Sequence, residues 1–205
     1  YPTKVLGGPI TLIKDTVQGY DILTRETAAL DIYSRLEKID INKLRKSAAQ
    51  YISNWAVKGA KLTKLHPSYP NLMIELETFR GCPRERHCAF CSERLKKVHY
   101  TRTPNQIIKE VKKLGELGNH HFRLGCQTDI LSYAADQKGK LNPQKMEKLY
   151  SGIKKADPNL EVLHLDNINP ATLIHQEKAG RKIIEIITRY NTAGDTAAFG
   201  LESAD

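Results

Sequence analysis

The chain of 205 residues is poor in cysteine, with four, and has one tryptophan and two methionines. Four cysteines are too few for the disulfide framework of a small secreted protein. No apolar run approaches the ~20 residues that a membrane-spanning helix needs. The first residues, YPTKVLGGPITLIK, lack the charged start, apolar stretch and cleavage site of a signal peptide. We therefore expect a cytoplasmic protein with no membrane partner.

Basic residues outnumber acidic ones, with 32 Lys and Arg against 23 Asp and Glu, so the formal net charge is +9. Such a surplus suits an anionic partner such as nucleic acid or a phosphorylated substrate. A solvated basic surface is an equal explanation, because the cations are scattered along the chain. RNA is therefore a candidate partner on charge alone.

The pattern of the sequence changes near residue 70. Residues 1–69 predict a mostly helical segment, which ends at the proline-rich linker HPSYPN. Residues 70–205 alternate between strand-like and helix-like stretches. The predicted strands are NLMIELETF, HHFRLGCQTDI, NLEVLHLDNIN and DTAAFGLESAD, and the predicted helices are TPNQIIKEVKKLGELG, NPQKMEKLYSGIKKA and NPATLIHQEKAGRKIIEIITRYN, the last interrupted at Gly180.

Alternating strands and helices predict an α/β fold with parallel strands and right-handed crossovers. Both open doubly wound sheets and (β/α) barrels have this pattern, and both bind ligands at the carboxyl ends of the strands. Four stretches with suggestive chemistry lie at those ends: 77–91, 125–129, 166–169 and 200–205. Glu75 and Glu77 share one face of the first strand, either inward or outward. Asp166, Asn167 and Asn169 form either a helix-capping turn or ligand contacts.

Three of the four cysteines lie in one loop after the first predicted strand, in the stretch ETFRGCPRERHCAFCSE. Cys82, Cys88 and Cys91 have the spacing C-x5-C-x2-C. Clustered thiolates bind zinc or an iron–sulfur cluster. A zinc site needs a fourth ligand, for which Cys126, His87, His120 and His121 are candidates. Three thiolates alone instead suit a cubane cluster with one open iron.

The loop resembles that of the radical S-adenosylmethionine (SAM) superfamily, which has C-x3-C-x2-C after the first strand and an aromatic residue before the last cysteine. The phrase ELETFRGCPRERHCAFCSE looks most like archaeal iron–sulfur oxidoreductases related to the cobalamin-binding branch. The resemblance covers residues 70–205 and implies a partial (β/α) barrel, with four βα units visible here. Because the family barrel has six units, we expect this one to be truncated at its C-terminal end.

The resemblance implies that Cys82, Cys88 and Cys91 ligate a [4Fe-4S] cluster that reductively cleaves SAM to a 5′-deoxyadenosyl radical. It places Phe90 beside the adenine. The family turn GGE, which binds the methionine amino group, reads GCQTD here. Gly125 fits that turn, Cys126 and Gln127 replace the second Gly and the Glu, and the implied contact passes to Gln127, Thr128 or Asp129. The segment FGLESAD resembles the family GxES segment and implies further SAM contacts, which are Glu202 and Ser203.

The same resemblance implies an electron donor such as ferredoxin or flavodoxin, and cobalamin is a further candidate cofactor. It identifies neither the substrate nor a catalytic side chain. A different class of function, a nucleic-acid-binding module with a structural zinc, remains open because of the net charge of +9. That alternative predicts a tetrahedral fourth ligand.

Overall fold

The computed structural model describes residues 2–7, 11, 17–24, 27–84, 88–95 and 100–199. Three parallel strands form one sheet in the order β3 (Met73–Glu77), β6 (His121–Gly125) and β7 (Val162–Leu165). One residue beyond β7, β8 (Asn167–Ile168) pairs in parallel with β9 (Ala198–Phe199). The strands follow one another in chain order, so the predicted α/β arrangement with parallel strands is confirmed.

Helices connect these strands: α5 (Pro104–Gly115) after β3, α6 (Pro143–Ala156) after β6, and α7 (Pro170–His175) with α8 (Glu177–Tyr190) after β8. The first three begin with a polar cap followed by proline, as the sequence predicts. Thr103 and Gln106 form a full capping box at α5. None of the helices in the described part has the length and hydrophobicity of a membrane span.

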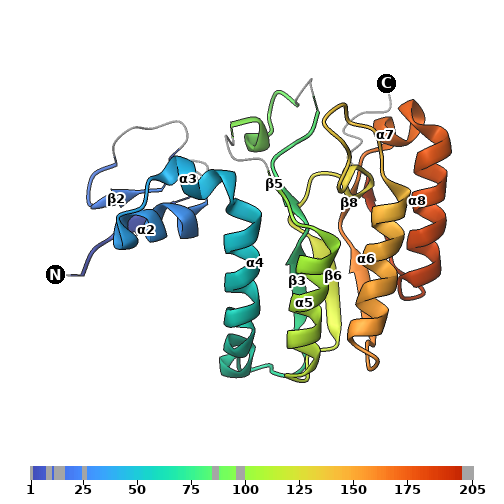
Figure 1. Ribbon diagram of the computed structural model, residues 1–205, viewed down its shortest axis with the longest axis horizontal. Coiled ribbons are helices and arrows are strands. Elements are labelled where there is room, and N and C mark those ends of the chain that lie inside the picture. Colours follow the sequence, from blue (N-terminus) through green and yellow to red (C-terminus); the bar gives the residue numbers. More distant parts are fainter. Residues whose placement is uncertain are drawn as a thin grey trace.

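The helices cover one face of the sheet within the described residues. Leu76, Leu124 and Leu165 are buried in one core with residues of α5, α6 and α8. Figure 1 shows α4, α5, α6 and α8 side by side, and packing contacts join each to the next. The alternate strand residues point to the opposite face, where Glu75 is exposed. A doubly wound sheet carries helices on both faces, so this arrangement differs from one.

The N-terminal part is built from a short parallel pair and a run of helices: β1 (Val5–Leu6), β2 (Ile22–Leu23), α2 (Ala28–Glu37), α3 (Ile41–Lys46), α4 (Ala48–Gly59) and the 3₁₀ helix η1 (Ala60–Leu65). Its small core contains Leu30, Leu44 and Ala48, together with Tyr100 from the following unit. Helix α4 packs on α5, and Gln106 Nε2 donates to Gln50 Oε1 over 3.1 Å. The division into residues 1–69 and 70–205 therefore stays a prediction. Helix α4 on one side of the boundary packs directly on helix α5 on the other.

The predicted interruption at Gly180 is wrong. The break between α7 and α8 lies at Gln176, whose side chain accepts from Leu141 N–H over 3.0 Å and donates to the Gly139 carbonyl over 2.8 Å. These bonds tie the junction to the loop before α6. Gly180 lies inside α8, where a Cβ would come within 2.7 Å of Leu173 Cδ1. Glycine there permits the close approach of α7 and α8.

Candidate functional site

The cysteine loop leaves and rejoins the fold through two short strands. β4 (Phe79–Arg80) and β5 (Tyr100–Thr101) pair in antiparallel fashion. The sequence did not predict this pair, whose residues Phe79 and Tyr100 are buried. Within the loop, Cys88 and Cys91 flank one turn, closed by a 3.2 Å hydrogen bond from Cys91 N–H to the Cys88 carbonyl. The loop is thus anchored at its base, while its cysteines stay partly exposed.

The loop meets the carboxyl ends of β6 and β7 around a cavity of about 540 Å³. The lining residues come from three separate segments: Arg80, Cys82, Arg84, Cys88, Phe90, Cys91 and Glu93; Cys126, Gln127, Thr128 and Asp129; and Asp166, Asn167, Ile168 and Asn169. Parallel strands bring such distant segments together, because their carboxyl ends meet at one edge. Three of the four segments singled out in the sequence therefore line one cavity. The fourth, with Glu202 and Ser203, lies outside the described residues.

Phe90 and Gly125 occupy different positions relative to this cavity. Phe90 is 72% exposed on the cavity wall, so its ring is accessible for stacking on a planar ligand. Gly125 is the buried last residue of β6 and lies behind the wall. A Cβ at Gly125 would come within 2.2 Å of Glu75 Oε1, so glycine leaves the space into which the Glu75 side chain folds.

Gln127 is 3% exposed and both ends of its side-chain amide are occupied. Its Oε1 accepts from the Thr78 hydroxyl over 3.2 Å, and its Nε2 donates to the Leu124 carbonyl over 3.1 Å. Its backbone carbonyl accepts from Asn167 Nδ2 over 3.3 Å. The geometry therefore favours a role in holding β3, β6 and the segment after β7 in register around the cavity.

Asp129 is 2% exposed, and its carboxylate accepts hydrogen bonds from neighbouring protein groups. Oδ1 accepts from the backbone N–H groups of Leu131 and Asn169, over 3.2 and 3.1 Å. Oδ2 accepts from the Ser132 hydroxyl over 2.7 Å, at the start of the 3₁₀ helix η3 (Ile130–Ser132). Asp129 thereby joins the loop after β6 to the start of α7. Asn169 caps α7, as one of the two alternatives from the sequence predicted.

Cys126, the fourth cysteine, follows β6 directly and also lines the cavity. Its φ of 56° lies in the left-handed region, which is unusual for a residue with a side chain. The Glu75 carboxylate accepts from Cys126 N–H over 2.9 Å and holds this turn. Burial, followed by the charges of Glu75 and Glu77, raises the pKa of the Cys126 thiol to about 12. The thiol is therefore protonated at neutral pH.

A buried arginine, which no sequence pattern indicates, lies beneath the loop. Arg102 is 1% exposed and follows β5, and its guanidinium lies 2.7 Å from Glu110 Oε2 on α5. It also donates to Ser53 Oγ on α4 over 2.9 Å and to the Glu77 carbonyl over 3.0 Å. The Tyr133 hydroxyl donates to the Arg102 carbonyl over 2.8 Å. Arg102 thus joins α4, α5 and the strand that enters the loop.

A metal centre requires several His, Cys, Asp or Glu side chains placed close together. Within the described ranges, no group of three or more His, Cys, Asp or Glu side chains is placed closely enough to hold a metal ion, and all four cysteines are free. The chemistry nevertheless suits thiolate ligation, because three cysteines line one cavity and Arg84 Nη1 lies 3.4 Å from Cys88 Sγ. Binding a cluster would require the loop to draw these sulfurs together.

The histidines considered as zinc ligands are engaged elsewhere. His120 Nδ1 lies 2.9 Å from Asp157 Oδ2, and His121 Nε2 lies 2.9 Å from Glu161 Oε2. Both histidines precede or begin β6, at the opposite end of the strand from the cavity. His87 lies outside the described residues. Of the four candidates for a fourth ligand, Cys126 is the one that the structure puts on the cavity wall.

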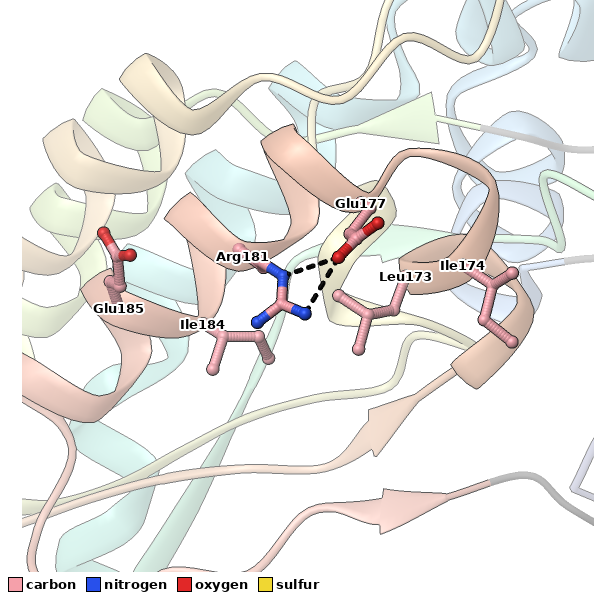
Figure 2. A pocket seen from close by; sticks show the side chains of 6 residues that line it. All are labelled: Leu173, Ile174, Glu177, Arg181, Ile184 and Glu185. Carbon is pink, nitrogen blue, oxygen red and sulfur yellow. Dashed lines mark hydrogen bonds and ion pairs between the residues drawn. The ribbon is translucent and has the colours of Figure 1, made fainter.

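A second hollow, of about 460 Å³, lies on helices α7 and α8 (Figure 2). Its described lining consists of Leu173, Ile174, Glu177, Arg181, Ile184 and Glu185. The figure shows Arg181 turned toward Glu177, with which it forms an exposed ion pair. This lining offers an apolar surface with one surface ion pair and none of the thiols found in the first cavity.

No family model matches the chain. It is 39% identical over 156 residues to an uncharacterized protein of Archaeoglobus fulgidus, covering 75% of this chain and 29% of that protein. It is also 39% identical over 218 residues to the uncharacterized protein MJ0274 of Methanocaldococcus jannaschii, covering all of this chain and 40% of that protein. The chain spans less than half the length of the curated relatives it matches.

Proposed function

We propose that the chain belongs to a radical SAM enzyme in which Cys82, Cys88 and Cys91 ligate a [4Fe-4S] cluster. One observation carries the proposal: these three cysteines line a single cavity at the carboxyl ends of parallel strands. Ligands of such α/β folds gather at that edge. A volume of about 540 Å³ is within the range of cavities that hold drug-sized ligands, which suits a nucleoside with an amino-acid tail.

The proposed reaction divides the work between the cofactors and the chain. The bound cluster would supply the electron that cleaves SAM to methionine and a 5′-deoxyadenosyl radical, which acts on a substrate still to be identified. The protein would bind the cofactors and orient them. Phe90 offers an exposed ring for the adenine, and Arg84 places an N–H group beside the Cys88 sulfur. Gln127 and Asp129 keep the neighbouring loops in place through the bonds described above.

The proposed architecture is a partial (β/α) barrel formed by residues 70–205. Helices on one face and exposed polar residues on the other support it, because a barrel has helices outside and side chains pointing into its interior. The preceding helical segment would be a separate N-terminal unit. Glu202 and Ser203 remain proposed SAM contacts. The truncation of the barrel at its C-terminal end also remains a proposal.

The proposed partners follow from this chemistry. Ferredoxin or flavodoxin would supply the electron, and cobalamin is a candidate second cofactor. Four free cysteines suit a reducing compartment, so we place the protein in the cytoplasm. RNA remains a candidate substrate, supported by the net charge of +9.

A second candidate function is a zinc-containing nucleic-acid-binding module. The observation that favours it is the presence of Cys126 on the same cavity wall, which makes four thiols available. Four thiolates would close a tetrahedral zinc site. The two candidates differ in one testable respect: the zinc site needs Cys126, whereas the cluster site needs the other three cysteines alone.

The decisive experiment is anaerobic reconstitution with iron and sulfide. The wild-type protein should bind about four irons and four sulfides per chain, with the charge-transfer absorbance of a cluster. Cys82→Ser, Cys88→Ser and Cys91→Ser should each lose the cluster, and Cys126→Ser, the matched control, should retain it. Stoichiometric zinc that depends on Cys126 would instead establish the second candidate and exclude the first.

A further inference from the structure

A ligand with an α-amino acid portion brings an ammonium group into the cavity. A cation removed from water requires an anionic partner, and a hydrogen bond to a carboxylate is the strongest that a side chain offers. The inference below rests on the proposed function, because SAM is the ligand that carries this group. The question is which carboxylate near the cavity has an oxygen to offer.

Glu93, on the cavity wall, already has an interaction partner, and three other nearby carboxylates are committed to protein groups. Asp129 accepts the three hydrogen bonds described above and is almost fully buried. Glu77 forms an ion pair with Arg80 and accepts from the Tyr100 hydroxyl. Asp166 forms an ion pair with Arg123, and its side chain is 18% exposed. A ligand ammonium would have to compete with a cation or a donor at each of these positions.

Glu75 is different from all three. It is exposed on the open face of the sheet, and no cationic partner for it is found among the described residues. Its Oε1 accepts from the N–H of Cys126, a residue on the cavity wall, over 2.9 Å. Its side chain folds over Gly125, which turns the carboxylate toward the carboxyl end of β6. The Cys126 thiol is a second, neutral hydrogen-bond partner of the Glu75 side chain, and a carboxylate that accepts from two neutral donors still has lone pairs to offer a cation.

Two backbone features keep the Glu75 carboxylate in this position. Gly125 has no Cβ, and any side chain there would collide with Oε1. Cys126 adopts a left-handed conformation with φ 56°, which points its N–H at the carboxylate. A residue with a side chain is held in this region at a cost in free energy, and such strain clusters at ligand sites. The turn is thus built around the carboxylate.

We propose that Glu75, positioned by Gly125 and the Cys126 N–H, accepts the ammonium group of the amino-acid portion of SAM. Glu75 would then take the part for which the sequence suggested Gln127 or Asp129. The proposal names a binding residue on the first strand of the sheet, one strand away from the turn GCQTD. Glu75 itself lies just behind the cavity wall, against the N–H of the lining residue Cys126.

The test measures binding of three probes to the reconstituted full chain by calorimetry. SAM carries the ammonium, the carboxylate and the sulfonium; S-adenosylhomocysteine carries the ammonium and the carboxylate without the sulfonium; and 5′-methylthioadenosine carries none of the three. Glu75→Gln retains an oxygen for Cys126 N–H and removes the charge. Gly125→Ala retains the charge and displaces the carboxylate. Both variants should bind SAM and S-adenosylhomocysteine about tenfold more weakly, the difference between a charged and a neutral hydrogen bond, and should bind 5′-methylthioadenosine as the wild type does.

Glu161→Gln, at an exposed carboxylate at the opposite end of β6 from the cavity, serves as the matched control and should change each affinity by less than about twofold. Asp166→Asn and Glu93→Gln test the two rival carboxylates on the cavity wall. Unchanged binding of SAM by Glu75→Gln, with or without an ammonium-dependent loss in either rival variant, would overturn the assignment. Iron and sulfide content confirms that each variant retains its cluster. If the cluster-loaded wild type bound none of the probes, the proposed function itself would fail, and this assignment with it.

Discussion

The ion pair beneath the cysteine loop offers a sharp test of the fold. Arg102 is 1% exposed, and the Glu110 carboxylate 2.7 Å away has an exposed side-chain fraction of 11%. Glu110→Ala would leave the guanidinium buried without its anionic partner. Removal of one member of a buried ion pair costs about 3–5 kcal/mol, because the remaining charge is not solvated. The two other acceptors, Ser53 Oγ and the Glu77 carbonyl, are neutral and would compensate only in part.

Helix α5 itself provides the matched control. Glu116 caps the same helix and pairs with Lys113 over 3.2 Å, with side chains 50% and 44% exposed. An exposed pair contributes about 0–1 kcal/mol. Urea unfolding followed by circular dichroism should therefore show Glu110→Ala destabilised by at least about 2 kcal/mol more than Glu116→Ala. Equal losses in the two variants would refute the assignment of a buried charge pair.

The pH dependence provides a second measurement on the same residue. Burial raises the pKa of Glu110 above the ordinary value of 4.5, although Arg102 opposes that shift. The folded state therefore binds this proton more tightly than the unfolded state does. This contribution to the free energy of unfolding is fully present below about pH 4.5 and declines as the pH rises through the folded pKa. Glu110→Gln should lack this contribution. The free energy of unfolding of the wild type minus that of the variant should therefore fall as the pH rises.

Two further predictions concern the helix packing and the fourth cysteine. A Cβ at Gly152 on α6 would lie 2.2 Å from Ile108 Cδ1 of α5. In urea unfolding, Gly152→Leu should therefore lower the free energy of unfolding by about 1–3 kcal/mol. Lys155→Leu, at an exposed position of the same helix, should change it little, and equal changes in the two variants would contradict the packing. With Cys82, Cys88 and Cys91 all replaced by serine, Cys126 should react slowly with iodoacetamide at pH 8, because its pKa is raised to about 12. Glu75→Gln should lower that pKa and accelerate the reaction, and an unchanged rate would argue against the charge effect.

The sequence predicted those features of the fold that depend on residues close together in the chain. The period of apolar residues predicted α5 and α6, and the pairs Thr103-Pro104 and Asn142-Pro143 predicted their first residues. The order of strands and helices predicted that loops far apart in the chain would meet. Those loops line the cavity because parallel strands end at a common edge.

Features that depend on tertiary contacts were missed. The break at Gln176 depends on bonds to Leu141 and Gly139, some 35 residues away in sequence. Glycine at 180 looked like a helix breaker, but its lack of a side chain serves packing against α7. Arg102 gave no local signal, because an arginine is usually exposed. Only the fold shows that Gln127 and Asp129, chosen for their type, are saturated by protein groups.

The open face of the sheet bears on the proposal of a partial barrel. By strand register, Glu75 of β3, Arg123 of β6 and His164 of β7 lie at the same level, forming a row of ionisable groups across the sheet. The row Leu76, Leu124 and Leu165, one residue further along, points to the helices and is buried. In a doubly wound sheet a second helical layer would cover the ionisable row, and burial of those groups would carry a large desolvation cost. A barrel interior that admits water and a polar ligand carries no such cost. The composition of the strands therefore supports the proposed barrel, which stays a proposal.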